Sequence, residues 1–195
     1  FRVRAHPDEF YAKDFETRID VGDLADKMCG RHRPGHFAGV ATVVAKLFTL
    51  VEPQIAFFGQ KDAQQAIIVR RMAADLKFPV EVSICPIVRE PDGLAMSSRN
   101  VYLSPDQRRA APILYQSLRR AAALILAGER QAEAIRRAIE ETLASEPLAK
   151  PQYVAIVDTI RLEPVSVVNE TTLIALAVHI GDTRLIDNIL VSAPS

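Results

Sequence analysis

The stretch from residue 54 to residue 85 most restricts the folds open to this chain. Residues 55–58 are a short apolar run of the kind found in buried parallel strands. Residues 80–85 have the composition of a further strand. Between the two runs, apolar residues recur at helical spacing: Ile67, Ile68, Met72 and Leu76. A strand, a helix and a strand with short joints predict a parallel crossover unit.

The segments before this unit give mixed patterns. Residues 1–5 alternate apolar and charged side chains, as a strand would. Between residues 7 and 34 we expect a short strand around Phe15 to Val21 and a short helix over residues 23–28. A helix is predicted over residues 37–51, because apolar residues recur there with helical period and Glu52-Pro53 follows.

The second half of the chain predicts helices followed by strands. Ser104-Pro105-Asp106-Gln107 has the pattern of a capping box and begins a helix whose apolar stripe ends before Gly128. A second helix is expected over residues 131–145. Strands are expected at 153–157, 173–178 and 183–191. The predicted fold class is α/β: a partial Rossmann-like parallel sheet with flanking helices in residues 1–86, then a small α+β domain in residues 87–195.

Composition limits the classes of function. The 195 residues are 49% hydrophobic, which supports a packed core. Lys and Arg total 24 and Asp and Glu total 24, so no bulk charge indicates a nucleic acid or membrane partner. No apolar run is long enough for a membrane span. Cys29 and Cys85 lack metal-ligand spacing, which favours a reduced, cytoplasmic setting and no metal site.

The turn after the first predicted strand is a candidate anion site. Lys61 stands near the start of the following helix, where the helix macrodipole is unfavourable for a cation. A bound phosphate would remove this conflict, Gly59 would let the backbone approach it, and Asp62 could cap the helix. The alternative is a solvated lysine on a surface turn.

A second candidate site follows the predicted turn Glu90-Pro91-Asp92-Gly93. Two hydroxyls and a guanidinium, Ser97, Ser98 and Arg99, are suited to binding phosphate oxygens. We call residues 92–100 the phosphate loop. Its Ala-Met-Ser-Ser-Arg sequence resembles the Lys-Met-Ser-Lys-Ser loop of class I aminoacyl-tRNA synthetases and related nucleotidyltransferases. The alternative is a polar connector before a helix.

Four segments together resemble one family, pantothenate synthetase. They lie at residues 33–40, 58–65, 92–100 and 181–188, with the sequences RPGHFAGV, FGQKDAQQ, DGLAMSSRN and GDTRLIDN. The resemblance extends from about residue 15 to residue 191. It implies ATP-dependent condensation of pantoate with β-alanine through pantoyl adenylate, with release of AMP and pyrophosphate. Magnesium would accompany ATP.

The resemblance also implies roles for single residues. Catalytic roles fall to Lys61, Ser97, Ser98 and Arg99. Pantoate binding falls to Gln65 and Phe58. The residues implied in ATP binding are Gly59, Gln60, Lys61, Asp62, Val88, Met96, Ser97, Ser98 and Arg99. Arg33 and His36 are further candidates near the amine or phosphate end, although His36 is also explained as the start of a helix.

Two departures from the family matter. Gln60 stands where the family often has Glu, a change expected to be harmless. The family's N-terminal part, with its His-rich nucleotide signature and first pantoate-binding glutamine, is not in this sequence, so we expect weak or no turnover. A homodimer through the helix at 37–51 is a further expectation, although burial in the protein's own core explains the same apolar stripe.

Two other classes of function stay open. One is a nucleotidyltransferase that activates a different acid, for which Gln65 and Phe58 would fit poorly. The other is a non-catalytic nucleotide-binding module that keeps the shape without the chemistry. A shift in melting temperature with pantoate would exclude the first, and the lack of any shift with ATP, pantoate or magnesium would favour the second.

Overall fold

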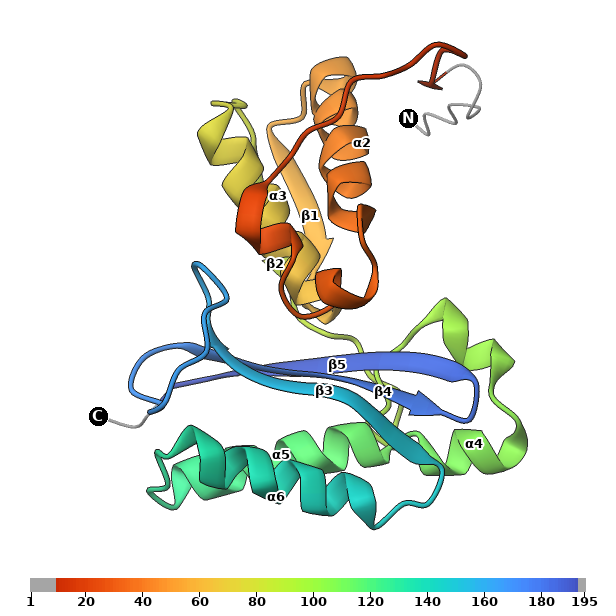
Figure 1. The fold of residues 1–195 in the computed structure, drawn as a ribbon, viewed down its shortest axis with the longest axis vertical. Helices are drawn as coiled ribbons and strands as arrows, with labels where there is room; N and C mark the ends of the chain where they lie inside the picture. The colour runs from red at the N-terminus through yellow and green to blue at the C-terminus, as the bar shows by residue number, and fades with distance from the viewer. Residues whose placement is uncertain (1–9, 193–195) are drawn as a thin grey trace.

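A parallel strand pair and an antiparallel sheet form two stacked layers. The computed structural model describes residues 10–192. In the upper layer, β1 (Ile55–Gly59) and β2 (Glu81–Cys85) pair in parallel and α3 (Ala63–Asp75) connects them (Figure 1). This arrangement confirms the predicted crossover unit. The strand expected at residues 1–5 lies outside the described residues.

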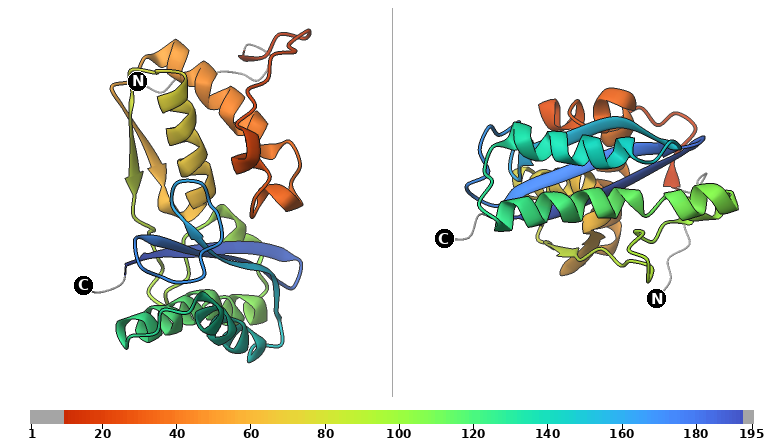
Figure 2. Two further views of the ribbon diagram at one scale, coloured as in Figure 1. Left: turned by 60° about the vertical axis from the view of Figure 1, so that its left-hand side comes forward. Right: turned by 90° about the horizontal axis from the view of Figure 1, so that it is seen from below.

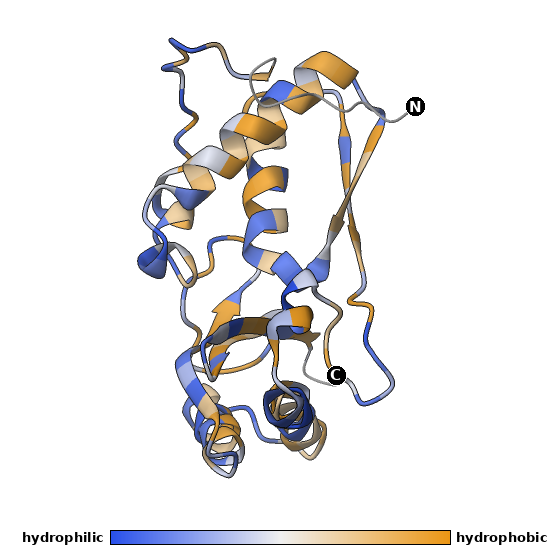
Figure 3. Cartoon of the chain, turned by 90° about the vertical axis from the view of Figure 1, so that its right-hand side faces the viewer, coloured by the Kyte–Doolittle hydropathy of each residue, from blue (hydrophilic) through white to orange (hydrophobic). Residues whose placement is uncertain are grey.

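Helix α2 (His36–Val51) stands beside α3 in the upper layer. It begins after Gly35, whose φ of 75° suits glycine, and it ends at Val51, with Glu52 as its C-cap before Pro53. Its apolar side chains pack with those of α3, and the hydropathy colouring of Figure 3 shows hydrophobic residues along both helices. The buried residues of this cluster are Ala41, Val44, Ala45, Phe48, Val69, Met72 and Ala73.

The lower layer is a three-stranded antiparallel sheet covered by two helices. Its strands β3 (Ala149–Asp158), β4 (Thr172–Ile180) and β5 (Thr183–Val191) lie in the order β3-β4-β5. Helices α5 (Ile113–Leu126) and α6 (Ala132–Ala144) cover the face turned away from the upper layer (Figures 1 and 2). The other face of the sheet meets the upper layer.

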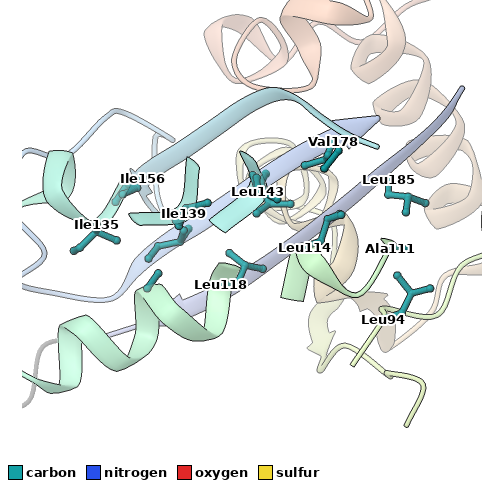
Figure 4. Packing of buried hydrophobic residues seen from close by; sticks show 14 of the residues in the cluster. Leu94, Ala111, Leu114, Leu118, Ile135, Ile139, Leu143, Ile156, Val178 and Leu185 are labelled. Atoms are coloured by element: carbon teal, nitrogen blue, oxygen red, sulfur yellow. The ribbon is translucent and has the colours of Figure 1, made fainter. Parts of the chain in front are cut away.

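The largest hydrophobic cluster lies between this sheet and its helices. Leu118 of α5, Ile139 and Leu143 of α6 and Leu176 of β4 have no solvent exposure. Figure 4 shows side chains from both helices pointing toward the strands. The predicted apolar stripes of these helices are therefore core faces, and the α/β fold class is confirmed.

Two predictions for the segment before α2 need correction. The expected strand around Phe15 to Val21 is not formed, and the backbone N–H of Ile19 donates to the side chain of Thr42 instead of to a neighbouring strand. The expected helix at 23–28 is a 3-10 helix, η1 (Gly22–Ala25). A strand needs a partner, and a single short segment cannot supply one for itself.

The helix predicted after Ser104 is two helices. The capping box is present, because the Ser104 hydroxyl accepts from the Gln107 N–H and the Gln107 side chain accepts from the Ser104 N–H. The first helix, α4 (Pro105–Ala110), then ends before Pro112. Proline has no N–H to continue the helical hydrogen bonds, so α5 starts as a separate element.

Candidate active site

A cavity of about 210 Å³ lies where the two layers meet. The turn after β1, the phosphate loop and β5 each contribute to its wall. Among the residues singled out from the sequence, it is lined by Arg33, His36, Lys61, Asp62, Gln65, Ser97, Ser98 and Arg99. The fold thus brings the Lys61 turn and the phosphate loop to one cavity, although they are distant in the sequence.

Lys61 lies on a 3-10 helix, η3 (Gln60–Asp62), between β1 and α3. Burial lowers the pKa of its ammonium group, the nearby Asp62 carboxylate partly offsets this, and the Arg99 guanidinium lowers the pKa further. Two cations from separate segments therefore repel each other across the cavity. A bound polyanion would offset this repulsion, because it would interact favourably with both charges.

The end of the phosphate loop is a tight, hydroxyl-capped turn. The Ser97 side chain accepts from the Arg99 N–H at 3.2 Å and begins the 3-10 helix η4 (Ser98–Tyr102). Ser98 and Arg99 are exposed. Their hydroxyl and guanidinium groups are thus free to meet a ligand at the mouth of the cavity.

Salt bridges hold the start of the phosphate loop in place. The predicted turn is present, since the Gly93 N–H donates to the Glu90 carbonyl at 2.8 Å. Arg108 of α4 donates to Glu90 at 2.6 Å and to Asp92 at 2.5 Å. The hydrogen bond from Arg108 lowers the pKa of the Asp92 carboxyl group. The loop is therefore tied to α4 on one side while Ser98 and Arg99 face solvent.

Arg33 and His36 form a pair at the rim of the cavity. The guanidinium of Arg33 and Nε2 of His36 are 2.9 Å apart. Burial, followed by the positive charge of Arg33, lowers the pKa of His36. His36 is also the first residue of α2, as expected. A neutral imidazole beside an arginine can accept a hydrogen bond without adding positive charge.

Two neighbouring glutamines at the start of α3 differ in burial. Gln64 is 5% exposed; its amide donates to the carbonyls of Leu24 and Lys27 and accepts from the Cys29 N–H. Both glutamines line the cavity, and Gln65, the residue predicted to bind pantoate, is half-buried there. The predicted helix cap is wrong, because the Asp62 side chain makes no capping hydrogen bond.

Five predicted residues do not line this cavity. Phe58 is half-buried and packs against the cluster between α2 and α3, and Gly59 and Gln60 precede Lys61 without joining the cavity wall. Val88 and Met96 are 66% and 56% exposed, and the Met96 N–H donates to the Val88 carbonyl at 2.9 Å. The contacts predicted for these five residues, with pantoate for Phe58 and with ATP for the others, would therefore be made outside this cavity.

Sequence reasoning missed a polar group on the opposite wall. Cys29 Sγ lies 3.1 Å from the Tyr153 hydroxyl, and the Arg184 guanidinium donates to the same sulfur at 3.2 Å. Burial raises the pKa of Tyr153. These three residues are far apart in the chain, so no local motif could join them, although Arg184 falls in the segment at 181–188 that carries the family resemblance.

Comparisons with known proteins identify a family for this chain. The family described as Pantoate-beta-alanine ligase matches residues 5–190. Pantothenate synthetases of Roseiflexus sp. strain RS-1 and Thermoanaerobacter sp. strain X514 are 53% and 54% identical over 95% and 94% of this chain. The chain covers 66% and 65% of those relatives, slightly less than two thirds of their length.

Solved structures give the same result for the fold. Pantothenate synthetase from Thermus thermophilus is 49% identical with a TM-score of 0.91, covering 95% of this chain and 67% of that one. A pantoate-beta-alanine ligase from Francisella tularensis, complexed with beta-gamma ATP and beta-alanine, is 31% identical with a TM-score of 0.71, covering 94% and 61%. The family match over most of the sequence and the shared fold lead to one conclusion: this chain belongs to the pantoate-beta-alanine ligase family.

Proposed function

We propose that this chain carries the ATP-binding and acid-activating site of an enzyme that condenses pantoate with β-alanine. One observation carries the proposal: Lys61 and the Ser97-Ser98-Arg99 segment, which are remote in sequence, line one cavity. Two cations and two hydroxyls at one small cavity suit a triphosphate better than a neutral ligand. Membership of the family supplies the choice of acid and amine.

The proposed reaction has two steps. A pantoate carboxylate oxygen attacks the α-phosphorus of ATP, a bond from that oxygen to phosphorus forms, and the bond to the β-phosphate breaks with pyrophosphate as leaving group. The β-alanine amine then attacks the acyl carbon of pantoyl adenylate, loses a proton, and AMP leaves. Negative charge grows on the α-phosphoryl oxygens and on pyrophosphate in the first step, where Lys61 and Arg99 would stabilise it.

The remaining assignments extend this proposal. Ser97 and Ser98 would donate to phosphate oxygens, and Gln65 at the cavity wall would bind pantoate. Gly59, Gln60, Asp62, Val88 and Met96 would contact ATP around the cavity, and Phe58 would line the pantoate pocket. Magnesium would enter as the counter-ion of ATP, held mainly by phosphate oxygens.

We also propose how the site is distributed over the fold. A boundary near residue 86 would divide a nucleotide-binding domain from a C-terminal domain that carries the phosphate loop. We propose a cytoplasmic homodimer, with the exposed Leu47, Leu50 and Val51 at the end of α2 as a candidate contact. Within residues 10–192, no helix is long and apolar enough to cross a bilayer. Sedimentation of the purified protein would measure the assembly state.

Single-turnover kinetics test the catalytic roles. Lys61→Ala and Arg99→Ala are each introduced into the intact enzyme. Each substitution should lower the rate of pantoyl adenylate formation by about 10²-fold or more. Arg109→Ala is the matched control, since Arg109 is 72% exposed and, within residues 10–192, forms an ion pair with Asp106 alone, in the first turn of α4. Unchanged rates in both test variants would refute the assigned roles.

Thermal unfolding with ligands separates the alternative functions. The melting temperature should rise with ATP and magnesium and rise again with pantoate, since a ligand that binds only the folded state stabilises it. A rise with ATP but none with pantoate would favour a nucleotidyltransferase for another acid. No rise with either ligand would favour a non-catalytic module.

A further inference from the structure

Two neighbouring residues of β5 hold opposite walls of the cavity. Asp187 and Asn188 are 3% and 2% exposed, although both are polar. Successive side chains of a strand point to opposite faces, so adjacent residues normally reach different surroundings. Here the Asn188 side chain bonds to the turn that carries Lys61, and the Asp187 side chain reaches the phosphate loop through Arg89.

Asn188 holds the turn that carries Lys61. Its side-chain amide nitrogen donates to the carbonyls of Gln60 and Lys61, at 2.9 Å and 3.1 Å. Its side-chain oxygen accepts from the amide of Gln60 at 3.2 Å. A buried amide with all these partners fixes the backbone of η3 relative to β5.

Asp187 holds the base of the phosphate loop through Arg89. The two guanidinium nitrogens of Arg89 donate to the two carboxylate oxygens of Asp187, at 2.7 Å and 2.9 Å. Arg89 also donates to the Gly93 carbonyl at 3.0 Å, and its guanidinium lies 3.8 Å from the ring centre of Tyr115. The fork geometry of the arginine fixes both position and orientation.

We propose that Asp187 and Asn188 are positioning residues that set the spacing between the Lys61 turn and the phosphate loop. This inference rests on the proposed function, because the spacing matters for a ligand that contacts both segments. Asp187 and Asn188 are joined by one peptide unit of a buried strand. A shift of the Lys61 turn or of the phosphate loop would therefore strain the hydrogen bonds of the other segment. Such preorganisation lowers the cost of ordering the site when a triphosphate binds.

Hydrogen exchange tests the positioning claim without any ligand. Asn188→Ala should speed amide exchange in residues 59–66, and Asp187→Asn should speed it in residues 89–100, with β4 unchanged in both. Controls with the same substitutions far from the cavity are Asn169→Ala and Asp75→Asn. If Asp187→Asn does not fold, Arg89→Lys keeps the charge but loses the fork. Unchanged exchange in both segments, or equal acceleration in β4, would overturn the claim.

Binding measurements separate this claim from the proposed function. ATP and inorganic tripolyphosphate should each bind about tenfold more weakly to Asn188→Ala and to Arg89→Lys, the loss expected for one buried hydrogen-bonded contact. Adenosine affinity should change much less, because adenosine reaches no phosphate-binding group. If the variants loosen the segments yet bind ATP normally, positioning is refuted while the function stands. If the original chain binds neither phosphate ligand, the function fails, and exchange alone decides whether β5 holds the segments.

Discussion

The two layers of this protein differ in how completely they bury their apolar residues. In the lower layer, every residue of β4 except His179 is buried. In the upper layer, alternate residues of β1 are exposed, with Ile55 at 46% and Phe57 at 69%. Parallel sheets usually have both faces covered, so β1 has an uncovered apolar face in the described chain. The lower layer therefore has the more completely buried sheet, while the upper layer contributes the Lys61 turn.

The largest expected effect is a cavity in the lower layer. Leu176→Ala in β4 should reduce the free energy of unfolding by about 2–5 kcal/mol, because Leu176 is fully buried. Phe57→Ala in β1 should change it by less than about 0.5 kcal/mol. Urea denaturation followed by circular dichroism measures both. A cost for Phe57→Ala equal to that of Leu176→Ala would show that the β1 face is covered in solution.

A smaller effect is expected at glycines in the two regions. Gly93 has a φ of +94°, and an added Cβ would stand 2.4 Å from the Tyr115 ring. Gly93→Ala should therefore cost about 1–3 kcal/mol of unfolding free energy. At Gly59, φ is −77° and no atom lies within 4 Å of an added Cβ. Gly59→Ala should leave stability unchanged, and a drop in its ATP affinity alone would support close approach of a phosphate.

The boundary between the layers should respond to pH through Lys61. Burial lowers the pKa of Lys61 below 10.5, so in the interval between its folded-state pKa and 10.5 the unfolded chain binds more protons. The free energy of unfolding should therefore rise with pH across that interval. Lys61→Met removes this contribution, so the free energy of unfolding of this variant should rise less with pH over the same interval. Parallel stability curves from neutral pH to 10.5 would contradict the lowered pKa.

The smallest effect is expected at surface ion pairs. Arg71 and Asp75 form an i,i+4 pair on α3 in which both side chains are more than half exposed. Asp75→Asn should change the free energy of unfolding by at most about 0.5 kcal/mol. In the lower layer, Glu141→Gln should be equally mild, because the Arg120–Glu141 pair is similarly exposed. A cost well above this value in α3 alone would mark the upper layer as the more fragile one.

Local patterns predicted most elements because each depends on nearby residues. The apolar period of α2, the capping box at Ser104 and the glycine after α5 all act within a few residues. The expected strand near Ile19 failed for the opposite reason, since a strand exists only where a partner is available. The split between α4 and α5 had a local signal in Pro112, which the apolar stripe obscured.

The residues of the candidate site also differ in how far local sequence could predict them. Lys61, Ser97 and Arg99 were predicted because each lies in a short motif next to a turn. Gln65 was predicted to bind pantoate, but only packing shows that its neighbour Gln64 hydrogen-bonds to the loop at 24–29. Cys29 and Tyr153 gave no local signal, because their partners lie 124 and 155 residues away. Asp187 falls in the segment at 181–188, but its partner Arg89 is 98 residues away, so its role could not be predicted.

The sequence by itself determined most of the elements, the family resemblance and the chemical character of the two segments proposed to bind phosphate, because these follow from spacing and residue type. Only the tertiary structure decided that the segments share one cavity and that β5 holds both. Hydrogen bonds between residues distant in the chain form when the layers pack together, and a buried amide or carboxylate there is stabilised only by the partners that packing supplies.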